Sequence, residues 1–455
     1  MEQTKENKMG VMPVNKLLVT MSLPIVISML IQAMYNLVDS VFVAQINPDA
    51  LTAVGMAFPM QSLMIAFQTG LGVGMNALVS RYLGQKKPYE AGLAATHALI
   101  LTALNYVVFL IVGLTAIPAF FSIQTHSEII AGYGVEYLSI VCCGSLGLFF
   151  QIYGERILQA TGKTLLSMVS QILGAVINIV LDPVFIFVFG WGIKGAAWAT
   201  VIGQVVSGVL VIVYFWKFRN MYLTGAMLKP KMPYLKAIIS LGLASCINQI
   251  AMAIVQIVLN NILRHYGADS VYGSDIPIAC VGIVSKVNMV FMAICIGISQ
   301  GSQPIWGFNY GAKKYDRVRQ AYRYSVTACT VIATIFFFCF QIFPHQIVGI
   351  FGTGSDLYFQ FAERYLKIFM FMTFANGIQP VSSGFFTSIG MAKLGIVMSL
   401  TRQVIFLLPL IIIFPLFMGI DGVMYAGPIA DAAAFVLAIV FARRELGKMR
   451  SAEIV

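Results

Sequence analysis

The sequence predicts an all-α polytopic membrane protein with twelve transmembrane helices in two six-helix lobes. Its composition, the charge of its loops and an internal repeat support this prediction. Of the 455 residues, 59% are hydrophobic and 10% are charged, and the mean hydropathy is +0.85. Soluble domains are about half apolar and a quarter charged, so a water-soluble enzyme and a disordered chain are excluded. Continuous apolar runs favour helices over a barrel, whose strands alternate.

Twelve apolar runs are separated by charged residues, Gly or Pro, and each is long enough for the ~20 residues that a spanning helix needs. We expect spans at residues 15–44, 52–80, 92–118, 131–158, 163–189, 194–217, 235–262, 276–306, 318–343, 357–389, 394–418 and 421–443. The expected organisation is an N-terminal lobe, a cytoplasmic inter-lobe loop, a C-terminal lobe and a cytoplasmic tail, at residues 1–217, 218–234, 235–443 and 444–455.

Basic residues are concentrated in alternate loops. Lys86 and Lys87 follow the second span, and Lys313 and Lys314 follow the eighth, whereas the opposite loops hold mainly acids. The positive-inside rule then places both termini in the cytoplasm of a multi-pass cell-membrane protein. These loops account for the net charge of +11, so no nucleic acid partner is expected.

The second half of the chain repeats the first at an offset of 227 residues. The repeat pairs Gly70 with Gly297, Gly74 with Gly301, and Gly84-Gln85-Lys86-Lys87 with Gly311-Ala312-Lys313-Lys314. With six spans in each half, both halves enter the membrane from the same side, so the repeat is parallel. Halves of this kind typically move about a substrate site between them, which favours a transporter over a duplicated channel or enzyme.

Ionisable side chains inside a bilayer are costly and are functional candidates by default. Asp39 in the first span and Asp182 in the fifth are two of them, and Asn178 shares a helical face with Asp182. Thr200 lies early in the sixth span. At a rise of 1.5 Å per residue, Asp39, Asp182 and Thr200 lie roughly 7–11 Å below the outer surface and can converge.

Two carboxylates, an amide and a hydroxyl can hold Na⁺, or the carboxylates can share a proton, because like charges in a low dielectric repel each other. The alternative is a structural hydrogen-bond network between the first, fifth and sixth helices. The repeat partners of Asn178, Asp182 and Thr200 are Ile405, Pro409 and Gly427. A cation-coupling site therefore belongs to the N-terminal half.

Further polar residues within the spans are candidates for the substrate cavity or for coupling. They are Gln32, Asn36, Gln256, Lys286, Arg402 and Asp431. Lys286, Arg402 and Asp431 could pair with one another as a brace, or an exposed cation could contact substrate. Pro24 and Pro183 each interrupt a span and are expected to act as conformational hinges.

No motif supports ATP hydrolysis or other enzyme chemistry. Gly162-Lys163-Thr164 resembles the end of a P-loop, but Ile157 stands where the first glycine is required. We therefore expect no enzyme and no cofactor, and transport driven by H⁺ or Na⁺.

The chain resembles the multidrug and toxic compound extrusion (MATE) family of secondary transporters over essentially all twelve spans. The resemblance rests on Leu23-Pro24…Asp39, Gly84-Gln85-Lys86, Asn178-x-x-x-Asp182-Pro183, Gly195-Ala196-Ala197-Trp198-Ala199-Thr200, Gln300-Gly301-Ser302-Gln303-Pro304 and Asn309-Tyr310-Gly311-Ala312-Lys313. It implies two lobes forming a V, and export of cationic or amphipathic drugs by a monomer in the lipid bilayer, in exchange for H⁺ or Na⁺.

In the DinF-like branch of this family, the cation site uses residue types that map onto Asp39, Asn178, Asp182 and Thr200. The NorM-like branch adds acids in helices 7 and 10. Here the seventh span has none, and Glu363 lies only at the outer start of the tenth. The resemblance is therefore closer to the DinF-like branch.

Three other functions stay open: a flippase, an intramembrane enzyme and a channel. A flippase for lipid-linked sugars of related architecture would need a cavity rich in Arg and Lys, but only Arg156, Lys286 and Arg402 lie within the spans. An intramembrane enzyme would need a nucleophile with a base or a metal, and no such group is evident. A channel would be recognised by ungated conductance.

Overall fold

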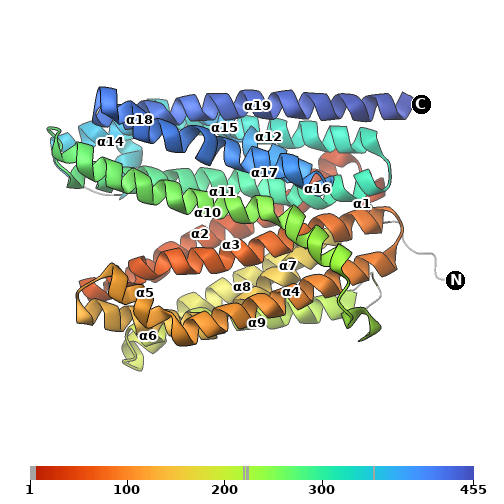
Figure 1. The fold of residues 1–455 in the computed structure, drawn as a ribbon, viewed down its shortest axis with the longest axis horizontal. Coiled ribbons are helices and arrows are strands. Elements are labelled where there is room, and N and C mark those ends of the chain that lie inside the picture. Colours follow the sequence, from red (N-terminus) through yellow and green to blue (C-terminus); the bar gives the residue numbers. More distant parts are fainter. Residues whose placement is uncertain (1–6, 219–220, 222–224, 352–353, 455) are drawn as a thin grey trace.

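The computed structural model describes residues 7–218, 221, 225–351 and 354–454. In this part of the chain, helices joined by short turns form two lobes, which lie side by side in Figure 1. The first lobe runs from red to yellow-green in the figure, and the second from green to blue.

The N-terminal lobe follows a short first helix, α1 (Lys8–Val11). Its elements are α2 (Val14–Ala44), α3 (Pro48–Gly84), α4 (Pro88–Thr115), α5 (Ile117–Gln124), α6 (Glu128–Cys143), α7 (Leu146–Ala160), α8 (Thr164–Pro183), the π-helical turn η1 (Val184–Val188) and α9 (Ile193–Phe218). A proline begins both α3 and α4, where its missing N–H would have no partner in any case.

The C-terminal lobe follows the inter-lobe loop, which contains the turn η2 (Gly225–Leu228). Its elements are α10 (Met232–Ala268), α11 (Asp275–Gly311), α12 (Tyr315–Ile342), α13 (Pro344–Phe351), α14 (Asp356–Phe369), α15 (Thr373–Asn376), α16 (Ile378–Ser388), α17 (Ala392–Leu400), the π-helical turn η3 (Thr401–Leu407), α18 (Leu408–Met418) and α19 (Ile420–Ile454). The described residues of the expected cytoplasmic tail, 444–454, are therefore part of the helix α19.

The predicted all-α fold of membrane-spanning helices is confirmed. Ten helical runs among the described residues are long and apolar enough to cross a bilayer, and the pair α6 and α7, bent by 46°, supplies an eleventh. The predicted span at 357–389 is divided among α14, α15 and α16. The sequence did not reveal these breaks, because apolar residues continue across them.

The repeat is visible in the helices themselves. The helices α3 and α11, with 37 residues each, begin 227 positions apart, as do the 28-residue helices α4 and α12. Lys86 and Lys313 are repeat partners, and they alone among the described non-glycine residues have a positive φ, of 58° and 57°. A left-handed residue closes the C-terminus of a helix, so α3 and α11 end in the same way.

Repeat-related glycines lie where the two lobes touch. A Cβ added to Gly74 would lie 2.0 Å from the backbone oxygen of Ile238, and one on Gly84 would lie 1.9 Å from that of Phe308. In the other half, a Cβ on Gly301 would lie 2.4 Å from the backbone of α2. Backbones can approach this closely only where there is no side chain. The helix pairs α3–α10 and α2–α11 therefore hold the lobes together.

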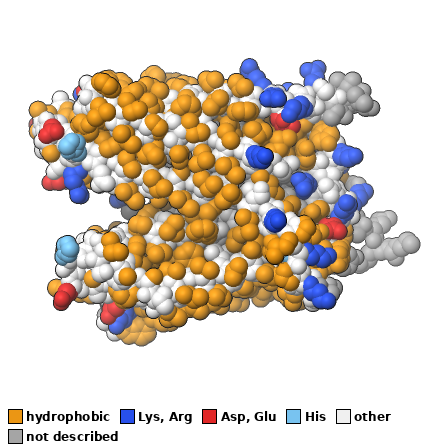
Figure 2. Space-filling view, viewed as in Figure 1, with side chains coloured by type: hydrophobic (Ala, Val, Ile, Leu, Met, Phe, Trp, Pro, Cys, Tyr) orange, Lys and Arg blue, Asp and Glu red, His pale blue; other side chains and the backbone are white. Residues whose placement is uncertain are grey.

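The end where the lobes meet is rich in basic residues. Figure 2 shows Lys and Arg gathered at this right-hand end, which we call the basic end. The ends of α3 and α11 meet here, since a Cβ on Gly311 would lie 2.2 Å from the backbone oxygen of Arg81, and the turns after them carry Lys86, Lys87 and Lys313. The helix α1 packs here against the C-terminal lobe, where Arg317 donates from Nη2 to the backbone oxygens of Met9 at 3.1 Å and Met12 at 2.6 Å.

The lobes separate toward the opposite end, which we call the open end. Gly55 and Gly282 are also repeat partners, but an added Cβ would meet nothing within 4 Å at either. Figure 2 shows a hollow between the two lobes at this end. The molecule is thus a V that is closed at the basic end.

Candidate functional site

Three helices of the N-terminal lobe, α2, α8 and α9, pack together and carry the predicted cation-coupling residues. Glycines bring α8 and α9 together, since a Cβ on Gly174 would lie 2.8 Å from the backbone oxygen of Gly203. Asp182 occupies the last turn of α8, directly before Pro183. Because proline has no N–H to donate, regular winding ends here, and the π-helical turn η1 follows.

The structure brings Asp39, Asn178, Asp182 and Thr200 together inside this lobe. The Asn178 amide nitrogen Nδ2 donates to Thr200 Oγ1 at 3.3 Å. One turn along α8, the carboxyl group of Asp182 lies within electrostatic range of that of Asp39 on α2. Asn178 and Asp182 are buried, with 3% and 0% of their surface exposed, and Asp39 and Thr200 are half-buried.

Several oxygens of this cluster are buried without a hydrogen-bond partner. They are Oδ1 of Asp39, Oδ1 of Asn178, and both Oδ1 and Oδ2 of Asp182. An unsatisfied buried polar group costs about 1–3 kcal/mol, and more when it is charged. Within the described residues, no Lys or Arg neutralises either acid. The cluster fits a Na⁺ ion, which oxygen ligands of this kind suit, or a shared proton.

Two tyrosines beside the cluster were missed by sequence reasoning. Tyr35 lies one turn before Asp39 on α2, within electrostatic range of both Asp39 and Asp182. Tyr137 on α6 lies within range of the same two acids, and its hydroxyl accepts a hydrogen bond from Gln61 Nε2 at 3.2 Å. The four-residue spacing of Tyr35 and Asp39 was visible in the sequence and could have identified Tyr35.

The predicted secondary candidates are distributed over both lobes. Gln32 Oε1 accepts a hydrogen bond from Gln171 Nε2 on α8 at 3.0 Å, which places Gln32 at the contact between α2 and α8. Asn36 is exposed on α2. In the C-terminal lobe, Gln256 Nε2 donates to Asn260 Oδ1 at 3.0 Å, one turn along α10.

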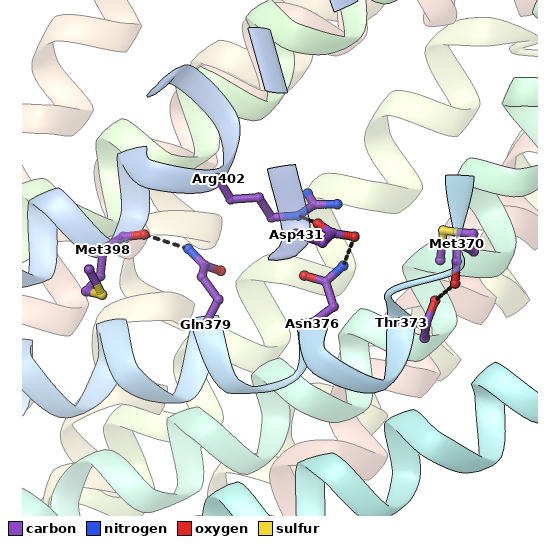
Figure 3. Close-up of polar contacts among 7 residues, drawn as sticks. All are labelled: Met370, Thr373, Asn376, Gln379, Met398, Arg402 and Asp431. Carbon is purple, nitrogen blue, oxygen red and sulfur yellow. Dashed lines mark hydrogen bonds and ion pairs between the residues drawn. The ribbon is translucent and has the colours of Figure 1, made fainter. Parts of the chain in front are cut away.

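Arg402 and Asp431 form a buried ion pair in the C-terminal lobe (Figure 3). Arg402 Nε lies 2.5 Å from Asp431 Oδ1, and Asn376 Nδ2 donates to Asp431 Oδ2 at 3.3 Å. Both oxygens of Asp431 are therefore satisfied, unlike those of Asp182. This cluster connects η3, α15 and α19 as an internal brace, and Lys286 takes no part in it. The sequence left two alternatives for these residues, a pair that acts as a brace or an exposed cation that contacts substrate. For Arg402 and Asp431, the structure shows the pair.

The two predicted hinge prolines differ in their surroundings. The helix α2 continues through Pro24 without a break. Pro183 ends α8 and precedes a π-helical turn. Only Pro183 of these two therefore interrupts regular helical winding in this conformation.

A family model described as MatE matches residues 24–184 and 244–413, most of both lobes. This chain belongs to the MATE family of transporters. The transporter is 25% identical over 453 residues to the multidrug export protein MepA of Staphylococcus aureus (strain MSSA476), and 97% of each chain is covered. It is 24% identical over 428 residues to MepA of Staphylococcus haemolyticus (strain JCSC1435), covering 93% of this chain and 92% of the relative.

The fold of this transporter is also found among solved structures. It matches an outward-facing conformation of a multidrug resistance MATE family transporter with a TM-score of 0.92 and 25% identity, covering 99% of this chain and 100% of the other. The two-lobe fold predicted from the sequence is therefore confirmed by family and by structure.

Proposed function

We propose that this transporter is a cation-coupled multidrug exporter of the DinF-like branch, which expels amphipathic or cationic compounds in exchange for H⁺ or Na⁺. The observation that carries the proposal is the pair of neighbouring carboxylates, Asp39 and Asp182, which lie inside the N-terminal lobe with unpaired oxygens and no basic partner among the described residues. The multidrug export named for both MepA relatives supports the substrate class.

The charge of the loops supports an orientation in the cell membrane. The positive-inside rule places the basic end, and with it both termini, in the cytoplasm. The V then opens to the outside, in agreement with the similarity to an outward-facing transporter. In this conformation, substrate would leave and the coupling cation would enter. We expect a monomer to suffice, because each chain contains both lobes.

The proposed mechanism uses the repulsion between the two carboxylates. Two like charges that lie close together in a low-dielectric interior favour binding of a cation between them. Binding of H⁺ or Na⁺ removes that repulsion and lets α2, α8 and α9 pack differently. The cation would stabilise one arrangement of the lobes, and the substrate would stabilise the other. Each would then weaken binding of the other, because the coupling between two binding sites is reciprocal. The protein would therefore exchange one for the other.

A structural network joining α2, α8 and α9 is the competing interpretation. It would satisfy its own polar atoms, as the Arg402–Asp431–Asn376 brace does. The unpaired oxygens of Asp39, Asn178 and Asp182 favour a cation site instead.

Purified protein in liposomes tests this proposal. Export of a fluorescent cationic dye is measured while a pH gradient or a Na⁺ gradient is imposed separately. We expect one gradient, directed inward relative to the cell, to drive export, and its dissipation by an ionophore to stop it. Equal dye movement with and without both gradients would contradict coupling and favour passive conductance.

A further inference from the structure

Lys286 is a lone cation on α11 at membrane depth. Its side chain is exposed, and within the described residues it forms no ion pair or hydrogen bond. Asp431, a buried acid of its lobe, is occupied by Arg402 and Asn376, and Glu445, another buried acid, pairs with Lys448. An ionisable residue within a membrane span is retained for a partner. No described residue of the chain supplies that partner for Lys286.

The position of Lys286 on its helix directs it toward the other lobe. It precedes Gly297 by eleven residues, or about three turns at 3.6 residues per turn, so both lie on one face of α11. That face contacts the N-terminal lobe, since a Cβ on Gly297 would lie 2.7 Å from Val26 of α2. Gly282 lies one turn before Lys286, toward the open end, and nothing lies within 4 Å of a Cβ added there. Lys286 therefore lies where this face leaves the contact and borders the space between the lobes.

Lys286 lies inside the membrane, at the level of the space between the lobes. It lies eleven residues from the start of α11 at Asp275, which is roughly 16 Å along a helix that is roughly 55 Å long. Since the hydrocarbon core is ~30 Å thick, α11 extends beyond it, and Lys286 lies in the half of the core nearer the open end. Substrate sites in transporters built from repeats lie within the membrane, at the interface between the repeats.

The neighbouring helix presents amides on the corresponding face. On α10, Gly242 contacts α3, and Gln249, Gln256 and Asn260 follow it after about two, four and five turns, on the same face. The surface that α10 and α11 present toward the other lobe, which we call the wall of the C-terminal lobe, thus carries the ammonium group of Lys286 and the amides of α10.

The acids of the cation site lie elsewhere. Asp39 follows Val26 by thirteen residues, which places it on the opposite side of α2, toward α8. The negative charge of the N-terminal lobe is therefore separated from Lys286 by α2. An anionic group beside Lys286 would not face those carboxylates directly.

We propose that the Lys286 ammonium binds the carboxylate, or a similar anionic group, of an amphiphilic substrate between the lobes. Resting on the proposed export function, this inference extends the substrate class from cations to zwitterionic and anionic amphiphiles. The amides of α10 supply hydrogen bonds along the same wall.

Two forms of one dye test this inference. A rhodamine with a free carboxyl group and its methyl ester differ only at the group that Lys286 would bind. Binding to purified protein is measured by fluorescence anisotropy, and export is measured in liposomes. Lys286→Met is expected to weaken binding of the free acid by roughly tenfold or more, because a charge-assisted contact is lost, and to change that of the ester by less than about twofold. Lys286→Arg should keep the preference of the wild type.

The controls separate the two proposals. Lys194→Met removes a positive charge from the open end, where Lys194 pairs with Glu136 at 3.1 Å, and should leave both dyes unaffected. Ester binding reports that each variant is folded. If Lys286→Met weakens both dyes equally, or neither, the Lys286 assignment is overturned. If the wild type binds the acid through Lys286 but exports no dye under any gradient, the proposed export function fails while the binding site stands.

Discussion

Replacing Asp182 with Asn is expected to abolish gradient-driven export while the protein still reaches the membrane. Asn has nearly the same shape but cannot exchange a proton, and it removes one of the two charges that bind a cation. Coupling between two sites is worth about 1–3 kcal/mol, or 5–150-fold, so its loss should lower export at least about fivefold, to the level measured without a gradient. The measurement is dye export from cells that carry equal amounts of wild-type and variant protein.

Asp39→Asn should give the same loss, and Asp316→Asn is the matched control. Asp316 lies on the exposed start of α12 at the basic end, far along the chain from both acids, and pairs with Arg319 at 3.2 Å. Its loss should leave export nearly unchanged. Normal export by both Asp39→Asn and Asp182→Asn would exclude the coupling site and favour a structural network.

Gly74→Val should prevent the lobes from closing at the basic end. A Cβ at this position would lie 2.0 Å from the backbone oxygen of Ile238, which cannot turn aside as a side chain can. Overpacking costs about 1–3 kcal/mol, and separation of the lobes relieves it. A cost of ~2 kcal/mol changes the ratio of closed to open forms by roughly thirtyfold. We expect a longer distance between spin labels at Lys87 and Asp316, and loss of export.

The matched control is Gly55→Val on the same helix. An added Cβ there meets nothing within 4 Å, so the same substitution should leave both the label distance and export close to wild type. An unchanged label distance in Gly74→Val would show that the lobes do not close through these glycines. Equal loss of export in both variants would attribute the effect to the altered helix α3.

Residue spacing was sufficient to predict that the polar residues of the N-terminal lobe converge. Asp39, Asp182 and Thr200 were placed at a common depth by counting residues from the ends of their spans, and α2, α8 and α9 do meet there. The repeat was equally readable, because glycine is required wherever backbones touch. Gly74 and Gly301 mark such contacts in the two halves.

The pairing in the C-terminal lobe could not be predicted in the same way. Lys286, Arg402 and Asp431 all lie within spans, and sequence does not give the rotation of one helix about its axis relative to another. The π-helical turn η3, which contains Arg402, shifts that rotation further. Only the packed structure shows that Arg402 meets Asp431 and that Lys286 has no partner in the described part of the chain.

Cation release on substrate binding tests the central mechanism most directly. Purified protein in weakly buffered detergent solution is mixed with a transported dye, while proton release is followed with a pH indicator and Na⁺ release with a radioactive tracer. The wild type should release one of the two cations as the dye binds, and the double variant Asp39→Asn/Asp182→Asn should bind dye and release neither. Equal release by the wild type and the double variant, or no release from the wild type, would contradict exchange at these carboxylates.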